Sequence, residues 1–113
     1  MKIIKDTISI EELEALAKDM FGDMVKAVVD VERKIMAVDG ELHSDEEALL
    51  IERGSKQQNL WGINLYPGIG DEGWIEFDSM INLRPSQGNR TRGVDDPETR
   101  KKIIEVVDRL IAR

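Results

Sequence analysis

The feature that most constrains the fold is a run rich in β-branched residues, from residue 24 to residue 38, that ends at Asp39-Gly40. Apolar side chains recur at alternate positions in this run, which is typical of a β-strand with one buried face. Asp-Gly is a strong signal for a tight hairpin turn. We therefore predict an antiparallel sheet whose longest strand covers residues 24–38 and turns back at Asp39-Gly40.

Residues 44–53, which follow this turn, have two interpretations. As a returning strand they place Asp45 opposite Lys34, a favourable pair of opposite charges. As a helix they begin with a capping box at Ser44 and end at Gly54. Four consecutive apolar residues inside the segment fit a buried strand at least as well as an amphipathic helix. Together with the charge pairing, they favour the strand.

Two further strands are predicted after residue 59. The first covers residues 60–66 and ends at Pro67-Gly68, which stops a strand. The second covers residues 74–84, where apolar and polar side chains alternate. Its polar positions are Glu76, Asp78, Asn82 and Arg84.

Two amphipathic helices flank these strands. A capping box at Ser9 and Glu12 opens the first, and Gly22 is expected to end it. Asp96, followed by Pro97 at the first helical position, opens the second. The expected fold is α+β: an antiparallel β-meander of four to five strands, with the N-terminal and C-terminal helices packed on one face and the other face open.

Composition limits the classes of protein and partner. With 113 residues, the chain is expected to form a single domain, residues 1–113. Its 16 basic and 23 acidic residues give a net charge of -7, which disfavours nucleic acid and anionic membranes as partners. It has no cysteine, and no apolar run is long enough for a signal peptide or a membrane span. We expect an acidic, soluble, cytoplasmic protein.

Three segments carry a resemblance to a known family. They are FGDMVKAVVD at 21–30, LWGINLYP at 60–67 and SMINLRPSQGNR at 79–90. The chain resembles an uncharacterised prokaryotic family of about this length, a domain of unknown function with no assigned activity. The resemblance covers nearly the whole chain and implies family membership, without implying any chemistry.

The first candidate site is the arginine loop, residues 84–95. No acidic residue occurs between positions 84 and 93, whereas the chain as a whole is strongly acidic. Guanidinium groups beside amide and backbone donors suit a phosphate, a carboxylate or a nucleotide. Alternatively, these arginines pair with surface carboxylates or with acidic groups of a partner. The candidate residues are Arg84, Ser86, Gln87, Asn89, Arg90 and Arg92.

The second candidate site is the polar face of the sheet. Crowded carboxylates there would raise one another's pKa and serve as general acid and base, or bind a hard cation. His43 is the only histidine, so a serine nucleophile at Ser79 or Ser86 would have to lie beside it. Gly62 would let a ligand approach the backbone. A solvent-exposed surface without a function is the simpler alternative. The candidate residues are His43, Glu76, Asp78, Asn82 and Arg84, with Asp30 on the same face.

The functional hypothesis from sequence is a small binding module that holds an anionic ligand or an acidic partner where the arginine loop meets the polar face. No cofactor is expected. A homodimer is predicted through the Asp39-Gly40 hairpin, because a long projecting arm would expose Ile35, Met36, Val38 and Leu42. Alternatively, the helices cover these side chains. The alternative is a small hydrolase or transferase that uses the carboxylates with Mg²⁺ or Mn²⁺.

Overall fold

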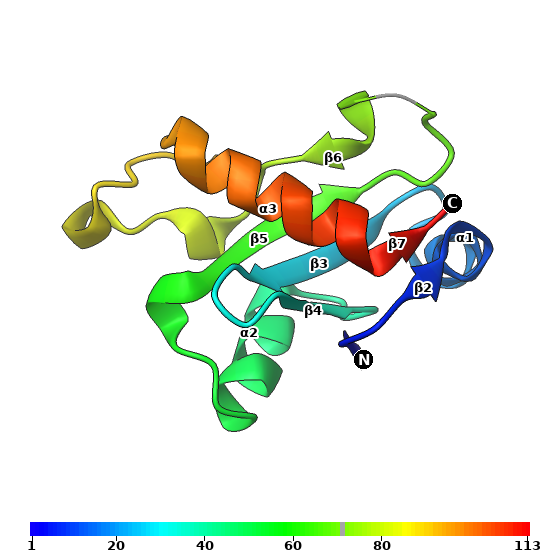
Figure 1. Ribbon diagram of the computed structural model, residues 1–113, viewed down its shortest axis with the longest axis horizontal. Helices are drawn as coiled ribbons and strands as arrows, with labels where there is room; N and C mark the ends of the chain where they lie inside the picture. Colours follow the sequence, from blue (N-terminus) through cyan, green and yellow to red (C-terminus); the bar gives the residue numbers. More distant parts are fainter. Residues whose placement is uncertain (71) are drawn as a thin grey trace.

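A computed structural model describes residues 1–70 and 72–113, and it has the predicted α+β fold (Figure 1). The strands are β1 (Lys2–Ile4), β2 (Ile8–Ser9), β3 (Val25–Asp30), β4 (Ile35–Val38), β5 (Leu60–Leu65), β6 (Ile75–Glu76) and β7 (Ile111–Ala112). The α-helices are α1 (Ile10–Met20), α2 (His43–Glu52) and α3 (Pro97–Leu110). Short 3₁₀ helices are η1 (Gln57–Asn59), η2 (Glu72–Trp74), η3 (Met80–Asn82) and η4 (Pro85–Gln87).

The main sheet has five antiparallel strands in the order β1-β4-β3-β5-β6, and β2 and β7 form a separate parallel pair. Helices α1 and α3 share one core with the face of the sheet that carries Val29 and Ile63. Helix α2 lies on the other face, where Leu50 packs in a smaller core with Val28 and Ala37. Figure 1 shows α3 across one side of the sheet and α2 on the opposite side. The face that was expected to be open is therefore partly covered by α2.

Both terminal helices begin where the sequence predicts. The Ser9 hydroxyl accepts a hydrogen bond from the Glu12 backbone N–H at 3.1 Å, which caps α1. Gly22 has a φ of +99°, a left-handed conformation that glycine adopts without strain. The Asp96 side chain caps α3, and Pro97 occupies the first turn. None of the helices in the described part of the chain is long and apolar enough to cross a membrane.

The predicted strand over 24–38 is wrong, because the chain turns back between residues 31 and 34. One carboxylate oxygen of Asp30 accepts hydrogen bonds from the backbone N–H groups of Glu32 and Arg33, at 3.0 and 2.9 Å. Lys34 then adopts a positive φ of 58° and donates its N–H to the Asp30 carbonyl. The hairpin is thus β3–β4, and an aspartate side chain rather than a glycine initiates its turn.

Substitution of Lys34 by glycine tests the position of this turn. Lys34 is exposed, and its left-handed backbone costs a side-chain-bearing residue about 1 kcal/mol. We expect Lys34→Gly to raise the free energy of unfolding by about 0.5 kcal/mol once the flexibility of glycine is included. Lys34→Ala keeps the strain and should leave stability unchanged. Chemical denaturation measures both variants, and a gain with alanine equal to that with glycine would contradict the assignment.

Asp39-Gly40 is not a hairpin turn, and residues 44–52 are helix rather than strand, with Arg53 as the C-cap. β4 already pairs with β1 on one side and with β3 on the other, so no place remains for a returning strand. Gly40 instead leads into α2, and a Cβ on it would lie 2.6 Å from Cγ of Glu46. Gly54, with a φ of +100°, ends α2 as the alternative interpretation predicted. The expected arm is absent, since Met36 is fully buried in the core. The homodimer remains a prediction, but the projecting hairpin arm that suggested it does not form.

The predicted strand over 74–84 is also largely wrong. Only Ile75 and Glu76 pair with β5, and the chain then turns into η3. Ser79 caps η3 by accepting a hydrogen bond from the Ile81 N–H at 3.2 Å. As a result, Phe77 packs against the core of α1 and α3, whereas Ile81 packs against the core of α2. This turn brings residues 78–82 over the polar part of the sheet.

Candidate functional site

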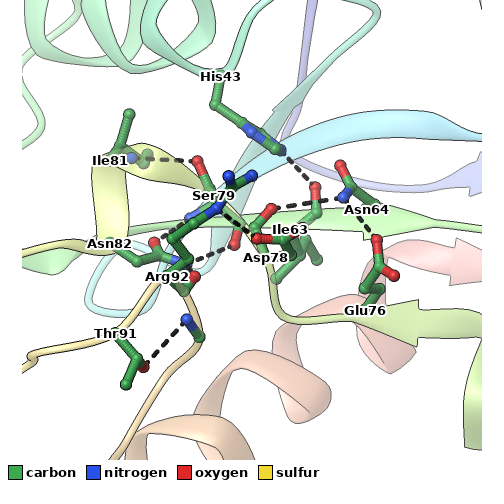
Figure 2. Close-up of polar contacts among 12 residues, drawn as sticks. His43, Ile63, Asn64, Glu76, Asp78, Ser79, Ile81, Asn82, Thr91 and Arg92 are labelled. Atoms are coloured by element: carbon green, nitrogen blue, oxygen red, sulfur yellow. Dashed lines mark hydrogen bonds and ion pairs between the residues drawn. The ribbon is translucent and has the colours of Figure 1, made fainter.

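A pocket of about 430 Å³ lies at the end of the sheet where β3 begins and β5 ends. We call it the sheet-end pocket. The first turn of α2 and residues 78–81 form its walls, and Arg92 closes one side. The pocket unites residues from both sites predicted from sequence, as Figure 2 shows. Its charged and polar groups include Lys26, His43, Asn64, Glu76, Asp78 and Arg92.

The two carboxylates of the pocket are each held by donors. One oxygen of Glu76 accepts hydrogen bonds from the Asn64 amide at 2.8 Å and from the Tyr66 hydroxyl at 3.2 Å. One oxygen of Asp78 forms an ion pair with Nε of Arg92 at 2.7 Å. Burial and the nearby Glu76 raise the pKa of Tyr66, so its hydroxyl stays protonated and donates. Asp78 is therefore paired with a cation, whereas Glu76 is held by neutral donors.

The two cations of the pocket have donors to spare. Arg92 binds Asp78 through Nε, and its two terminal nitrogens form no hydrogen bond with any described residue. Lys26 lies beside Asn64 in the register of β3 and β5. Its ammonium group is 5.5 Å from the ring centroid of Phe21 and donates to no acceptor in the described part of the chain. Both side chains are free to bind an incoming anionic group.

His43 contributes a neutral polar group. Its side chain is buried, with Nε2 2.8 Å from the Ile63 carbonyl oxygen. Because a carbonyl oxygen only accepts, Nε2 carries the proton and Nδ1 is left as an acceptor. Burial lowers the pKa of His43, so the ring is uncharged at neutral pH. This histidine shapes the pocket as a neutral hydrogen-bonding group and adds no positive charge.

Arg84 lies outside the pocket and connects the arginine loop to the sheet. Its guanidinium group stacks over the Trp61 ring, 4.1 Å from the centroid. Its terminal nitrogens donate to the carbonyl oxygens of Gln57, at 2.6 Å, and Leu60. With these contacts already made, Arg84 has a structural role.

Asn82 and Asn89 are also structural. Asn82 is fully buried, and its amide group pairs with both the N–H and the carbonyl of Gly62, at 2.9 and 3.0 Å. The Asn89 amide donates to the carbonyl oxygens of Asn82 and Gly93 at 2.7 and 2.8 Å. A Cβ on Gly62 would lie 2.5 Å from Cβ of Ser79. The missing side chain of Gly62 thus makes room for η3, whereas the sequence suggested room for a ligand.

The remaining candidate residues of the arginine loop, Ser86, Gln87 and Arg90, are exposed and do not line the sheet-end pocket. Gln87 donates to the Gln58 carbonyl oxygen at 3.2 Å, and the backbone N–H of Arg90 donates to Asp95 at 2.8 Å. Ser86 lies between them in η4. The three arginines therefore have separate environments, and only Arg92 reaches the pocket.

The carboxylate wall predicted on the sheet face does not form. Asp30 is fully buried at the far end of β3, where it accepts a hydrogen bond from Ser55 at 2.7 Å. Within residues 1–70 and 72–113, no three His, Asp or Glu side chains gather as a group able to hold a metal ion. Ser79 is buried as the cap of η3 and has no hydrogen bond to His43 among the described residues. Ser79 and His43 thus do not form a nucleophile–base pair in the described part of the chain.

The sequence interpretation missed Lys26 as a site residue. With the hairpin placed at Asp39-Gly40, the ends of β3 and β5 could not be aligned, so Lys26 had no partner. The usable signal was Asp30 followed by Glu32 and Arg33, since an aspartate can accept hydrogen bonds from the next two or three backbone N–H groups. A turn there ends β3 at Asp30, and in the structure β3 also pairs with β5, so that Lys26 lies opposite Asn64.

Comparison with known proteins agrees with the family resemblance. A family model described as a protein of unknown function (DUF5674) matches residues 2–110. Searches of the curated proteins and of the solved structures gave no match. Because this family model matches nearly the whole chain, the protein belongs to the DUF5674 family of unknown function.

Proposed function

We propose that this protein is a small binding module that holds an anionic ligand, a carboxylate or a phosphate, in the sheet-end pocket. The observation that carries the proposal is the difference in hydrogen bonding between the charged groups there. Glu76 and Asp78 already accept hydrogen bonds, whereas Lys26 and the terminal nitrogens of Arg92 donate none to the described residues. An anion would use donors that are already in place.

The first turn of α2 supports the same ligand charge. Leu42 is the N-cap residue and its side chain forms no capping hydrogen bond. Leu42, His43 and Ser44 line the pocket, so the start of the helix faces it. Helix N-termini favour negative charge through their free N–H groups and the helix dipole. The helix start thus favours an anion, and Asp45 in the same turn already meets part of this preference.

The size of the pocket limits the ligand to a small molecule. A volume of about 430 Å³ lies in the range of sites that bind small ligands. The net charge of -7 repels nucleic acid, which leaves a free metabolite as the fitting partner. A cytoplasmic location agrees with the absence of cysteine.

Removal of the two cations tests the proposal. In wild-type protein we expect inorganic phosphate, nucleotides or small carboxylates at millimolar concentration to raise the melting temperature by several degrees. The double variant Lys26→Met, Arg92→Ala should lose this increase. Both side chains are at least partly exposed, so their replacement should leave the fold intact. Thermal-shift measurements in buffers of constant ionic strength give the comparison.

Arg90→Ala provides the matched control. Arg90 is exposed in the same loop and does not line the pocket, so its variant should keep the full response. An equal response in all three proteins would mean that the anions act elsewhere. A lack of response in the wild type to every anion would reject the proposal.

A further inference from the structure

Apolar side chains also line the sheet-end pocket. Leu42 and Met80 are 56% and 63% exposed, and together with Met1 they are the most exposed large apolar side chains in the described part of the chain. Both line this pocket, Leu42 from the start of α2 and Met80 from η3. Met24, half-buried at the start of β3, lines it as well. Single exposed apolar residues are common, but three that surround one polar pocket indicate a shared partner.

The charged groups lie further along the same lining. Met24 directly precedes β3, and Lys26 follows it by two residues, so both side chains are on the side of the chain that lines the pocket. Met80 and its neighbour Ile81 are both apolar residues of the lining. Asp78, two residues before Met80, forms the ion pair with Arg92. A ligand bound by Lys26 and Arg92 would therefore have its remaining atoms beside methionine and leucine side chains. Methionine adapts readily to apolar groups of varied shape.

We infer that the ligand is an amphipathic anion: a carboxylate or phosphate bound by Lys26 and Arg92, attached to an aliphatic chain that packs against Met24, Leu42 and Met80. This inference rests on the proposed function and specifies the class of ligand. The anionic group supplies orientation, and the chain supplies affinity through burial of apolar surface.

A series of straight-chain carboxylates tests the role of the chain. Acetate, butanoate, hexanoate and octanoate carry the same charge and differ only in apolar length. Each buried methylene should lower the Kd about two- to fourfold until the chain extends beyond Met80. Titration followed by NMR of ¹³C-labelled methionine methyl groups reports both affinity and position. The Met24 and Met80 signals should shift, and that of Met36, fully buried in the core, should not.

Two variants separate the apolar contribution from the ionic one. Leu42→Ala, Met80→Ala should bind acetate as the wild type does but lose the dependence on chain length. Ile51→Ala, Ile104→Ala is the matched control, because these side chains are 43% and 38% exposed and lie outside the pocket lining. This control should keep the wild-type dependence.

The possible outcomes distinguish the two proposals. Equal affinity for acetate and octanoate, with both lost in Lys26→Met, Arg92→Ala, would overturn the amphipathic ligand and leave the anion site standing. Binding of 1-hexanol as tightly as hexanoate would overturn the anion site. No shift of Met24 or Met80 with hexanoate or octanoate would overturn the amphipathic ligand, while loss of the thermal-shift response to phosphate in Lys26→Met, Arg92→Ala would still support the anion site.

Discussion

Replacement of Glu46 by glutamine is expected to raise the free energy of unfolding by about 3 kcal/mol at pH 7. Glu46 is fully buried in α2, and burial raises its pKa to about 9. One carboxyl oxygen accepts a hydrogen bond from the Gly40 N–H at 2.9 Å, and the other has no partner among the described residues. Glutamine keeps the acceptor and the shape while removing the ionisable proton.

The direction of the effect follows from proton binding. The pKa in the folded protein, about 9, exceeds the ordinary value of 4.5 expected in the unfolded chain. Between these values the folded state binds more protons, so its stability falls as the pH rises, by about 1.4 kcal/mol per pH unit. The contribution of Glu46 is complete below about pH 4.5 and fully lost above about pH 9. The gain from glutamine should therefore be small at pH 5 and large at pH 8.

Urea denaturation at pH 5, 6, 7 and 8 measures this difference between the two proteins. Comparison at each pH cancels the titration of all other groups. Glu52→Gln, an exposed position at the end of α2, is the control and should change stability little at any pH. A gain from Glu46→Gln that is the same at pH 5 and pH 8 would show that Glu46 does not remain neutral in the folded protein.

Replacement of Asn82 by alanine is expected to lower the free energy of unfolding by about 3 kcal/mol. The change removes the amide that binds both backbone groups of Gly62 and the Arg92 carbonyl oxygen. Gly62 would be left in the buried part of the sheet without a partner for its N–H and carbonyl. Because η3 and the backbone of Arg92 depend on this amide, the wall of the sheet-end pocket should loosen as well.

Hydrogen exchange of the Gly62 amide, together with urea denaturation, checks this prediction. The amide should exchange much faster in Asn82→Ala than in the wild type. Asn82→Asp keeps the size and the acceptor but loses the donor, so it should also destabilise the protein. Asn59→Ala, which removes a more exposed hydrogen bond to Glu32, should cost less than about 1 kcal/mol. Slow exchange of Gly62 in Asn82→Ala would contradict the assigned role.

The fold class and the terminal helices could be predicted because their signals are local. Ser9 and Asp96 cap the helices that follow them through side-chain hydrogen bonds a few residues long. The hairpin could not be placed, because Asp30 and Lys34 make a turn without glycine while Asp39-Gly40 offers a stronger turn signal. Tertiary contacts decide between the two turns. β1 and β3 occupy both sides of β4, so the segment after Asp39-Gly40 cannot pair with it.

The sequence indicated which residues the candidate site contains, but not how they are arranged. His43, Glu76, Asp78 and Arg92 were all candidates, and the pocket unites them. Arg84 and Asn82 were candidates for the same chemical reasons, yet their polar groups serve Leu60 and Gly62. A sequence shows which side chains can donate or accept. It does not show which backbone groups will remain without partners after the strands pair.

The amide of Asn82 and the guanidinium of Arg84 have one more consequence, for solubility. β6 pairs with β5 only at Asn64 and Leu65, so most of the outer side of β5 lacks a neighbouring strand. The two side chains form hydrogen bonds with backbone groups of Gly62 and Leu60 there. Without these hydrogen bonds, the same backbone groups could pair with strands of other molecules. The protein thus blocks edge-to-edge aggregation with side chains where other folds add a strand.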